Sequence, residues 1–131
     1  MGYRSTVAYT IRFDGDDDTK NRQSFYLFLA EAKANVNTSL CFTDVDCFKV
    51  DEEKLQIRFY AEGVKWYEGY PDVQCHEELI SLSKSWAEDN NFIGGAFART
   101  GEDTTDIIEE TWGQGDYDWV GVNRSVYVDW E

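Results

Sequence analysis

The chain opens with alternating apolar and polar side chains. From Val7 to Phe13 an apolar residue occupies every second position, a period that predicts a strand with one buried face. The acidic run at residues 14–18 interrupts this pattern and offers side chains that cap helices. A helix over residues 19–34 is then predicted by apolar positions spaced three and four apart: Phe25, Phe28, Leu29 and Ala32.

The middle of the chain predicts a hairpin followed by a second helix. Residues 40–50 have extended character, residues 51–54 form a polar turn, and residues 55–60 alternate again as a strand. Pro71 suits the first turn of a helix, because its missing N–H is not needed there. Apolar residues at helical spacing extend this second helix to about residues 89–91.

Glycines and aromatic residues mark the final third of the chain. Residues 92–99 predict a strand, in which Gly94-Gly95 indicates a bulge or a close backbone approach. A short strand is expected within residues 105–112 and a turn at residues 113–116. Residues 119–130 then predict one last strand.

The predicted elements follow the order β-α-β-β-α-β with one or two further strands. This order resembles a ferredoxin-like α+β sandwich, an antiparallel sheet with two helices on one face and extra C-terminal strands. Glu62-Gly63 is a candidate bulge within it. A length of 131 residues favours a single domain over residues 1–131.

Charge restricts the possible partners more than any motif does. The chain has 26 acidic residues against 12 Lys and Arg, a formal net charge of −14, and is 16% aromatic. The aromatic content argues for a folded domain rather than a disordered acidic tail. A negative domain repels nucleic acid and anionic membranes and attracts cationic surfaces. We therefore expect a basic protein surface as the partner, with no direct nucleic-acid binding and no membrane association.

The densest acidic segment lies toward the C-terminus. Carboxylates fixed on strands can imitate the phosphates of duplex DNA, which carries one charge per roughly 1.7 Å of axis. A solvated charged face explains the same run without a partner. The candidate partner-binding residues are Glu102, Asp103, Asp106, Glu109, Glu110, Asp116 and Asp118, with Asp16, Asp17 and Asp18 as a secondary patch.

Three arginines in predicted strands define an alternative site. The segments Arg99-Thr100-Gly101 and Asn123-Arg124-Ser125 would meet Arg4-Ser5 at one end of the predicted sheet, which would gather Arg4, Arg99 and Arg124. A guanidinium cluster binds a phosphate or carboxylate through paired hydrogen bonds. The alternative function is therefore binding or turnover of an anionic small molecule or nucleotide. Ion pairing with nearby acids is the competing interpretation of the same residues.

No motif predicts catalysis, a metal or a cofactor. The chain lacks a nucleophile elbow, a Walker A loop, a dinucleotide fingerprint and an HExxH helix, so we assign no catalytic residue. A calcium loop that begins at Asp14 needs glycine at its sixth position and glutamate at its twelfth, where this chain has Thr19 and Phe25. Cys41, Cys47 and Cys75 contain no CxxC pair, and His76 is the one histidine. We expect reduced, buried thiols and a histidine that packs or caps on its helix.

Three short motifs lie toward the ends of the chain: Met1-Gly2-Tyr3-Arg4-Ser5, Phe97-Ala98-Arg99-Thr100-Gly101-Glu102-Asp103 and Val122-Asn123-Arg124-Ser125-Val126. They resemble segments of many small uncharacterised proteins encoded by bacteriophages. The resemblance implies a phage accessory protein acting in the cytoplasm of the bacterial host, and it carries over no catalytic residue. Phages encode acidic proteins that block host nucleases and defence complexes. The expected function is thus inhibition of a host or defence nucleic-acid-binding protein by DNA mimicry; a virion component is a third possibility.

Overall fold

The elements follow the predicted order, with an additional hairpin at the C-terminal end. The structure is a computed structural model that describes residues 3–67, 69–90, 92–103 and 105–113, and the backbone of residues 120–123 and 125–128. The elements are β1 (Ser5–Phe13), α1 (Asp18–Ala34), the 3₁₀ helix η1 (Ser39–Thr43), β2 (Phe48–Asp51), β3 (Gln56–Val64), α2 (Pro71–Asp89), β4 (Ile93–Thr100), β5 (Ile107–Gly113), β6 (Val120–Asn123) and β7 (Ser125–Val128).

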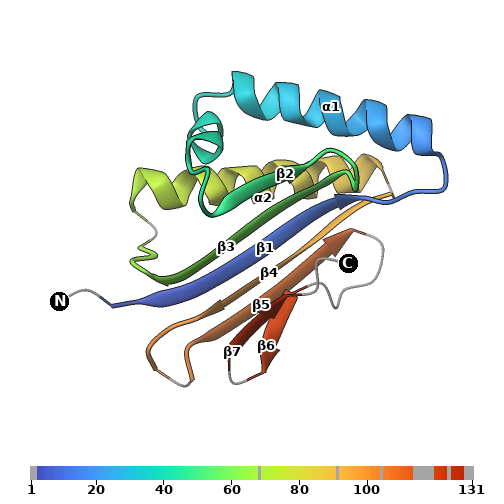
Figure 1. The fold of residues 1–131 in the computed structure, drawn as a ribbon. Helices are drawn as coiled ribbons and strands as arrows, with labels where there is room; N and C mark the ends of the chain where they lie inside the picture. The colour runs from blue at the N-terminus through green and yellow to red at the C-terminus, as the bar shows by residue number, and fades with distance from the viewer. Residues whose placement is uncertain are drawn as a thin grey trace.

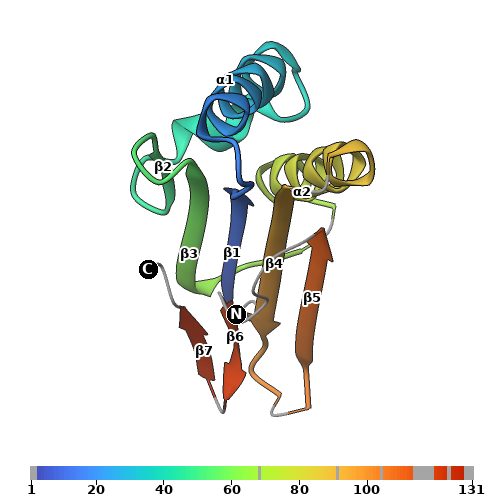
Figure 2. The same cartoon turned by 90° about the vertical axis from the view of Figure 1, so that its right-hand side faces the viewer.

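The sheet confirms the predicted architecture. Five strands pair antiparallel in the order β2-β3-β1-β4-β5, and both α-helices cover one face of this sheet (Figure 1). The central strand β1 therefore lies between β3 and β4, with β2 outside β3, as in a ferredoxin-like sandwich. Figure 2 shows β5 added beside β4, at the edge of the sheet. No helix in the described part of the chain is long and apolar enough to cross a bilayer.

The helix α1 forms where the sequence predicts it. The side chain of Asp17 caps the helix by accepting a hydrogen bond from the backbone N–H of Lys20 at 3.2 Å. The apolar stripe of α1 is buried against the sheet, with Phe25 and Phe28 fully buried. Both rings meet Phe13 of β1 edge to face, at centroid distances of 5.5 Å.

The central strand β1 is buried on both faces, which corrects the expectation of one buried face. Every residue of β1 except Thr6 is buried. One face packs under the helices, while the β6–β7 hairpin contacts β1 and β4 on the side away from the helices (Figure 1). The small and polar side chains of Ala8 and Thr10 are thus fully enclosed, and the Thr10 hydroxyl donates to the Ile57 carbonyl at 3.1 Å.

The expectation of extended chain over residues 40–50 is wrong for its first half. Residues Ser39–Thr43 form η1, and β2 begins only at Phe48. Local hydrogen bonds favour the turn, because the Thr43 hydroxyl donates to the Leu40 carbonyl at 2.7 Å and the Asp44 carboxylate accepts from the Cys47 N–H at 3.3 Å. Such side-chain bonds give the backbone an alternative to a sheet.

The single last strand expected over residues 119–130 is also wrong. The segment contains two strands, β6 and β7, which pair antiparallel with Val120 opposite Val128 and Asn123 opposite Ser125. A hairpin lets each short strand supply the backbone hydrogen-bond partners of the other. It also brings both strands against β1 and β4, which one continuous strand would not do. The predicted turn at residues 113–116 lies outside the described residues beyond Gly113.

Two glycine features are confirmed. Ser5 lies opposite Val64 and Val7 opposite Ala61, so two residues of β3 face one residue of β1 at the predicted bulge. Gly63 there has a φ of 62°, a value that glycine adopts without strain. In β4, a Cβ on Gly95 would lie 2.4 Å from the Trp112 ring, so the close approach is made by a side chain of β5.

Candidate functional site

The structure separates the two acidic patches that the sequence singled out. In the β1–β4 pairing, Phe13 lies opposite Ile93 and Thr6 opposite Thr100. The chain therefore leaves β1 toward residues 14–18 at one end of the sheet and leaves β4 at the other end. Strands of this length separate the patches by roughly 25 Å. Asp16, Asp17 and Asp18 are exposed but do not extend the C-terminal acidic segment.

The C-terminal acids fall into exposed and paired groups. Glu102 and Asp103 are exposed in the loop between β4 and β5, and Glu109 is exposed on β5. Two others are paired, since Asp106 bonds Arg99 and Glu110 bonds Lys84. Asp116 and Asp118 lie outside the described residues. We call Glu102, Asp103, Glu109 and Glu110, together with the exposed β5 residues Ile107 and Ile108, the acidic edge.

A bonded network fixes the base of the acidic edge. Arg99 donates from both terminal nitrogens to Asp106, at 3.1 and 2.8 Å, and the Tyr3 hydroxyl donates to the same carboxylate at 2.8 Å. The hydrogen bonds from Arg99 and then Tyr3 lower the pKa of Asp106 below its usual value. The Tyr3 oxygen in turn accepts from the Asp103 N–H at 2.9 Å. This network ties the β4–β5 loop to the start of β1.

The arginines are engaged with protein groups. Arg99 reaches the Ser5 hydroxyl at 3.4 Å, so the segments that carry these two residues do meet, but the terminal nitrogens of Arg99 bond Asp106. Arg4 is exposed and donates to the Gly63 carbonyl at 3.1 Å. Arg124 lies outside the described residues. Of the candidate cluster, Arg99 thus matches the ion-pairing interpretation, because its charge is compensated by the carboxylate of Asp106 in the β4–β5 loop.

A groove runs alongside the acidic edge on the helical face. Its volume is about 370 Å³, and it lies between α2 and the strands β4 and β5. The floor is apolar, whereas two ion pairs line the rim. The lining residues that matter are Trp66, Ile80, Phe97 and Ile108 on the floor, with Arg99–Asp106 and Lys84–Glu110 at the rim.

The strand β5 itself is unusually exposed. Six of its seven residues are exposed, and only Trp112 is buried. Ile107 and Ile108 keep 46% and 44% of their surfaces accessible to solvent, although they alternate in direction along the strand. Sequence analysis singled out the acids here but not the two isoleucines, because an apolar strand residue is ordinarily expected in the core.

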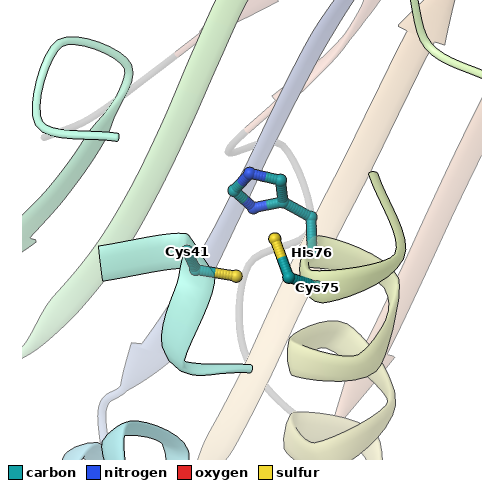
Figure 3. Close-up of side chains that lie close together, drawn as sticks. All are labelled: Cys41, Cys75 and His76. Atoms are coloured by element: carbon teal, nitrogen blue, oxygen red, sulfur yellow. The ribbon is translucent and has the colours of Figure 1, made fainter. Parts of the chain in front are cut away.

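A buried polar cluster under the helices was missed by sequence reasoning. The Tyr9 hydroxyl lies 2.6 Å from Nδ1 of His76, and the thiols of Cys41 and Cys75 lie beside the imidazole (Figure 3). His76 packs on Phe59, with ring centroids 4.3 Å apart, so the expectation of a packing role is confirmed. Burial lowers the pKa of His76 to about 4, against opposing effects of Asp44 and Asp72. The ring is therefore neutral at physiological pH.

The two buried thiols lie close enough to influence each other, and the Cys75 thiol donates to the Asp72 carbonyl at 3.2 Å. The interaction between the thiols raises the pKa of Cys41, with burial adding to the effect, and it lowers the pKa of Cys75. Cys75 is therefore the more acidic thiol. The adjacency of Cys75 and His76 was visible in the sequence, but nothing local indicated that Cys41 would join them.

No family model, curated protein or solved structure matches this chain.

Proposed function

We propose that the chain is an acidic accessory protein, of the kind phages produce in the bacterial cytoplasm. It inhibits a host or defence protein by occupying that protein's cationic nucleic-acid groove. The acidic edge makes the contact. The observation that carries the proposal is the exposure of β5, on which two isoleucines and two glutamates face solvent on one rigid strand.

The composition of the acidic edge supports this role. Protein interfaces combine an apolar centre with a polar rim. Successive residues of β5 project from opposite faces, so each face offers one exposed isoleucine beside one exposed glutamate: Ile107 with Glu109, and Ile108 with Glu110. The Arg99–Asp106 bond beneath them holds the loop in place, so binding costs little conformational entropy.

The charge of the whole chain adds long-range attraction. A net charge of −14 accelerates encounter with a positively charged partner and makes the rate sensitive to salt. The same negative charge repels nucleic acid. It fits instead the cationic grooves of proteins that bind nucleic acid. The proposal assigns no reaction to the chain.

The test is capture of partners from bacterial lysate on the immobilised protein. We expect specific capture at about 0.1 M salt and its loss at about 1 M, where the Debye length falls from roughly 10 Å to roughly 3 Å. Duplex DNA added as a competitor should release the partner, because both ligands occupy one groove. A partner that duplex DNA does not displace would contradict DNA mimicry.

Charge reversal locates the contact. The double variant Glu102→Lys, Glu109→Lys should lose capture, whereas Asp46→Lys, Glu53→Lys should retain it. Both pairs consist of exposed acids and change the net charge equally, but the second pair lies near β2, at the opposite edge of the sheet. Equal loss in both variants would show that only overall charge matters.

A second candidate function is supported by the groove. Its volume of about 370 Å³ falls within the range of small-molecule sites, and Arg99 on its rim suits an anionic metabolite or nucleotide. The ligand would have to displace Asp106 from Arg99. A thermal-shift screen with nucleotides should stabilise the wild type and Arg4→Ala but not Arg99→Ala; no shift across the panel would dismiss this function.

A further inference from the structure

The buried cluster under the helices has the composition of a metal site. We propose that Cys41, Cys75 and His76 bind one soft divalent cation of the zinc type. The site goes beyond the proposed function and is independent of it, since none of these three residues lines the groove beside the acidic edge.

Two elements bring the ligands together. Cys41 comes from η1, while Cys75 and His76 lie near the start of α2. Their ligand atoms, two sulfurs and one ring nitrogen, all lie within 4.8 Å of one another, and Figure 3 shows the side chains converging. Zn–S and Zn–N bonds of about 2.3 and 2.0 Å place tetrahedral ligands roughly 3.5–3.8 Å apart. Separations between ligand atoms therefore need to shorten by roughly 1.3 Å at most, which side-chain rotation provides.

The chemistry of the donors selects the metal. Thiolate sulfur and neutral imidazole are the donors that zinc prefers, whereas calcium and magnesium require oxygen. All three residues are buried, so water does not compete with these three ligands for the ion. Three protein ligands leave a fourth tetrahedral position, as in zinc sites that keep an exchangeable ligand.

Neighbouring side chains fix the orientation of the His76 ring. A histidine that binds metal is usually held by a hydrogen bond at its other nitrogen or ring edge. Tyr9, fully buried in β1, places its hydroxyl 2.6 Å from Nδ1 of His76, and Phe59 and Trp66 pack against the ring at centroid distances of 4.3 and 5.7 Å. The imidazole therefore has one fixed orientation before the metal arrives.

A negatively charged cavity gives a metal ion access to the cluster. A cavity of about 140 Å³ adjoins the cluster and is lined by Cys75 and His76 together with Asp44 and Asp72. The two carboxylates make this opening negative, which attracts a cation. Cys47 also lines the cavity but does not belong to the cluster, so it serves as the matched control.

Cobalt titration of the reduced, metal-free protein tests the proposal. Co²⁺ bound by thiolates in a tetrahedral site gives sulfur-to-cobalt charge-transfer absorption and intense visible bands. We expect these bands to saturate at one equivalent per chain, and Zn²⁺ to abolish them by displacement. Circular dichroism and thermal unfolding establish that each protein is folded.

Variants separate the ligands from their neighbours. Cys41→Ser and Cys75→Ser should lower the affinity for Co²⁺ by more than about 100-fold, and Tyr9→Phe by roughly 10–100-fold, the usual effect of removing a supporting hydrogen bond. Cys47→Ser should bind like the wild type. Metal binding that fails in Cys47→Ser but persists in Cys75→Ser would overturn the assignment.

The wild type alone can also overturn the proposal, whatever the variants do. Reduced, folded protein without charge-transfer bands holds no such site. Formation of a Cys41–Cys75 disulfide on mild oxidation, in protein that showed no bands beforehand, would assign the pair to redox chemistry instead. Neither result bears on capture of partners by the acidic edge, so the two proposals fail separately.

Discussion

The strands β1 and β5 belong to one sheet and differ sharply in burial. Eight of the nine residues of β1 are buried, including Thr10. In β5 only Trp112 is buried, and Ile107 and Ile108 remain exposed. The position of a strand in the sheet, rather than its apolar content, decides this difference. A central strand covered on both faces buries even its polar residues, whereas an edge strand can offer apolar ones to a partner.

Edge strands are sites where proteins either prevent or use association. Unpaired backbone groups on an edge promote pairing with other chains, and charged side chains are a common protection. Glu109 and Glu110 on β5 fit this protective role toward other copies of the chain. The same charges attract a cationic partner. The negative charge of the edge thus both repels other copies of the chain and favours a positively charged protein.

Shortening one isoleucine side chain in each strand should give the largest difference in the free energy of unfolding. Ile11 of β1 is fully buried, whereas Ile108 of β5 is 44% exposed. We expect Ile11→Ala to lower the free energy of unfolding by about 2–5 kcal/mol, the cost of a core cavity, and Ile108→Ala by less than about 1 kcal/mol. Urea unfolding followed by tryptophan fluorescence measures both values. Similar losses would show that β5 contributes to the core.

Acid should destabilise the buried His76 cluster and the Arg99–Asp106 bond in different pH ranges. Burial lowers the pKa of His76 from 6.5 to about 4, so the folded state binds this proton less tightly than the unfolded state does. Stability is then retained above about pH 6.5 and falls by about 3 kcal/mol as the pH drops toward 4. The Arg99 bond lowers the pKa of Asp106, so its contribution is lost only at lower pH, as the carboxylate protonates.

The measurement is the free energy of unfolding against pH, with a chelator present to exclude metal. The wild type is compared with His76→Gln, which removes the titrating imidazole and leaves every other ionisable group in place. The slope between neutral pH and about pH 4 should be smaller in the variant. Parallel curves would mean that His76 does not carry the dependence.

A close contact between β4 and β5 occurs at Gly95. A Cβ on Gly95 would meet the Trp112 ring at 2.4 Å and the Thr10 carbonyl at 2.7 Å, whereas a Cβ on Gly69 meets nothing within 4 Å. Gly95→Ala should therefore cost about 1–3 kcal/mol and change the Trp112 environment, while Gly69→Ala is nearly neutral. Urea unfolding measures the cost, and amide hydrogen exchange across β5 reports local loosening.

The smallest effect on stability belongs to the proposed binding residues. Glu109 is exposed on β5, so Glu109→Lys should change the free energy of unfolding by no more than about 0.5 kcal/mol. Thermal unfolding of this variant, measured beside partner capture, separates the two properties. A large loss of stability would place Glu109 in the fold rather than in an interface.

Much of the fold was predictable because its signals are local. The alternation in β1, the 3.6-residue period of α1 and the start of α2 at Pro71 each depend on neighbouring residues, and the structure confirms them. Residues 40–50 were mispredicted because the hydrogen bonds of Thr43 and Asp44 compete with a sheet without changing hydrophobic periodicity. The pairing of β6 with β7 likewise leaves no mark that distinguishes it from one longer strand.

The sequence by itself determined the order of the elements, the charge and the inventory of donors and acids. Only the tertiary structure decided which of these groups meet. It enclosed β1 from both faces, exposed β5, joined Arg99 to Asp106, and placed Cys41 beside Cys75 and His76. The physical reason is that periodicity records which side of an element is apolar. Contacts between residues distant along the chain are set by how whole elements pack, and no local pattern encodes them.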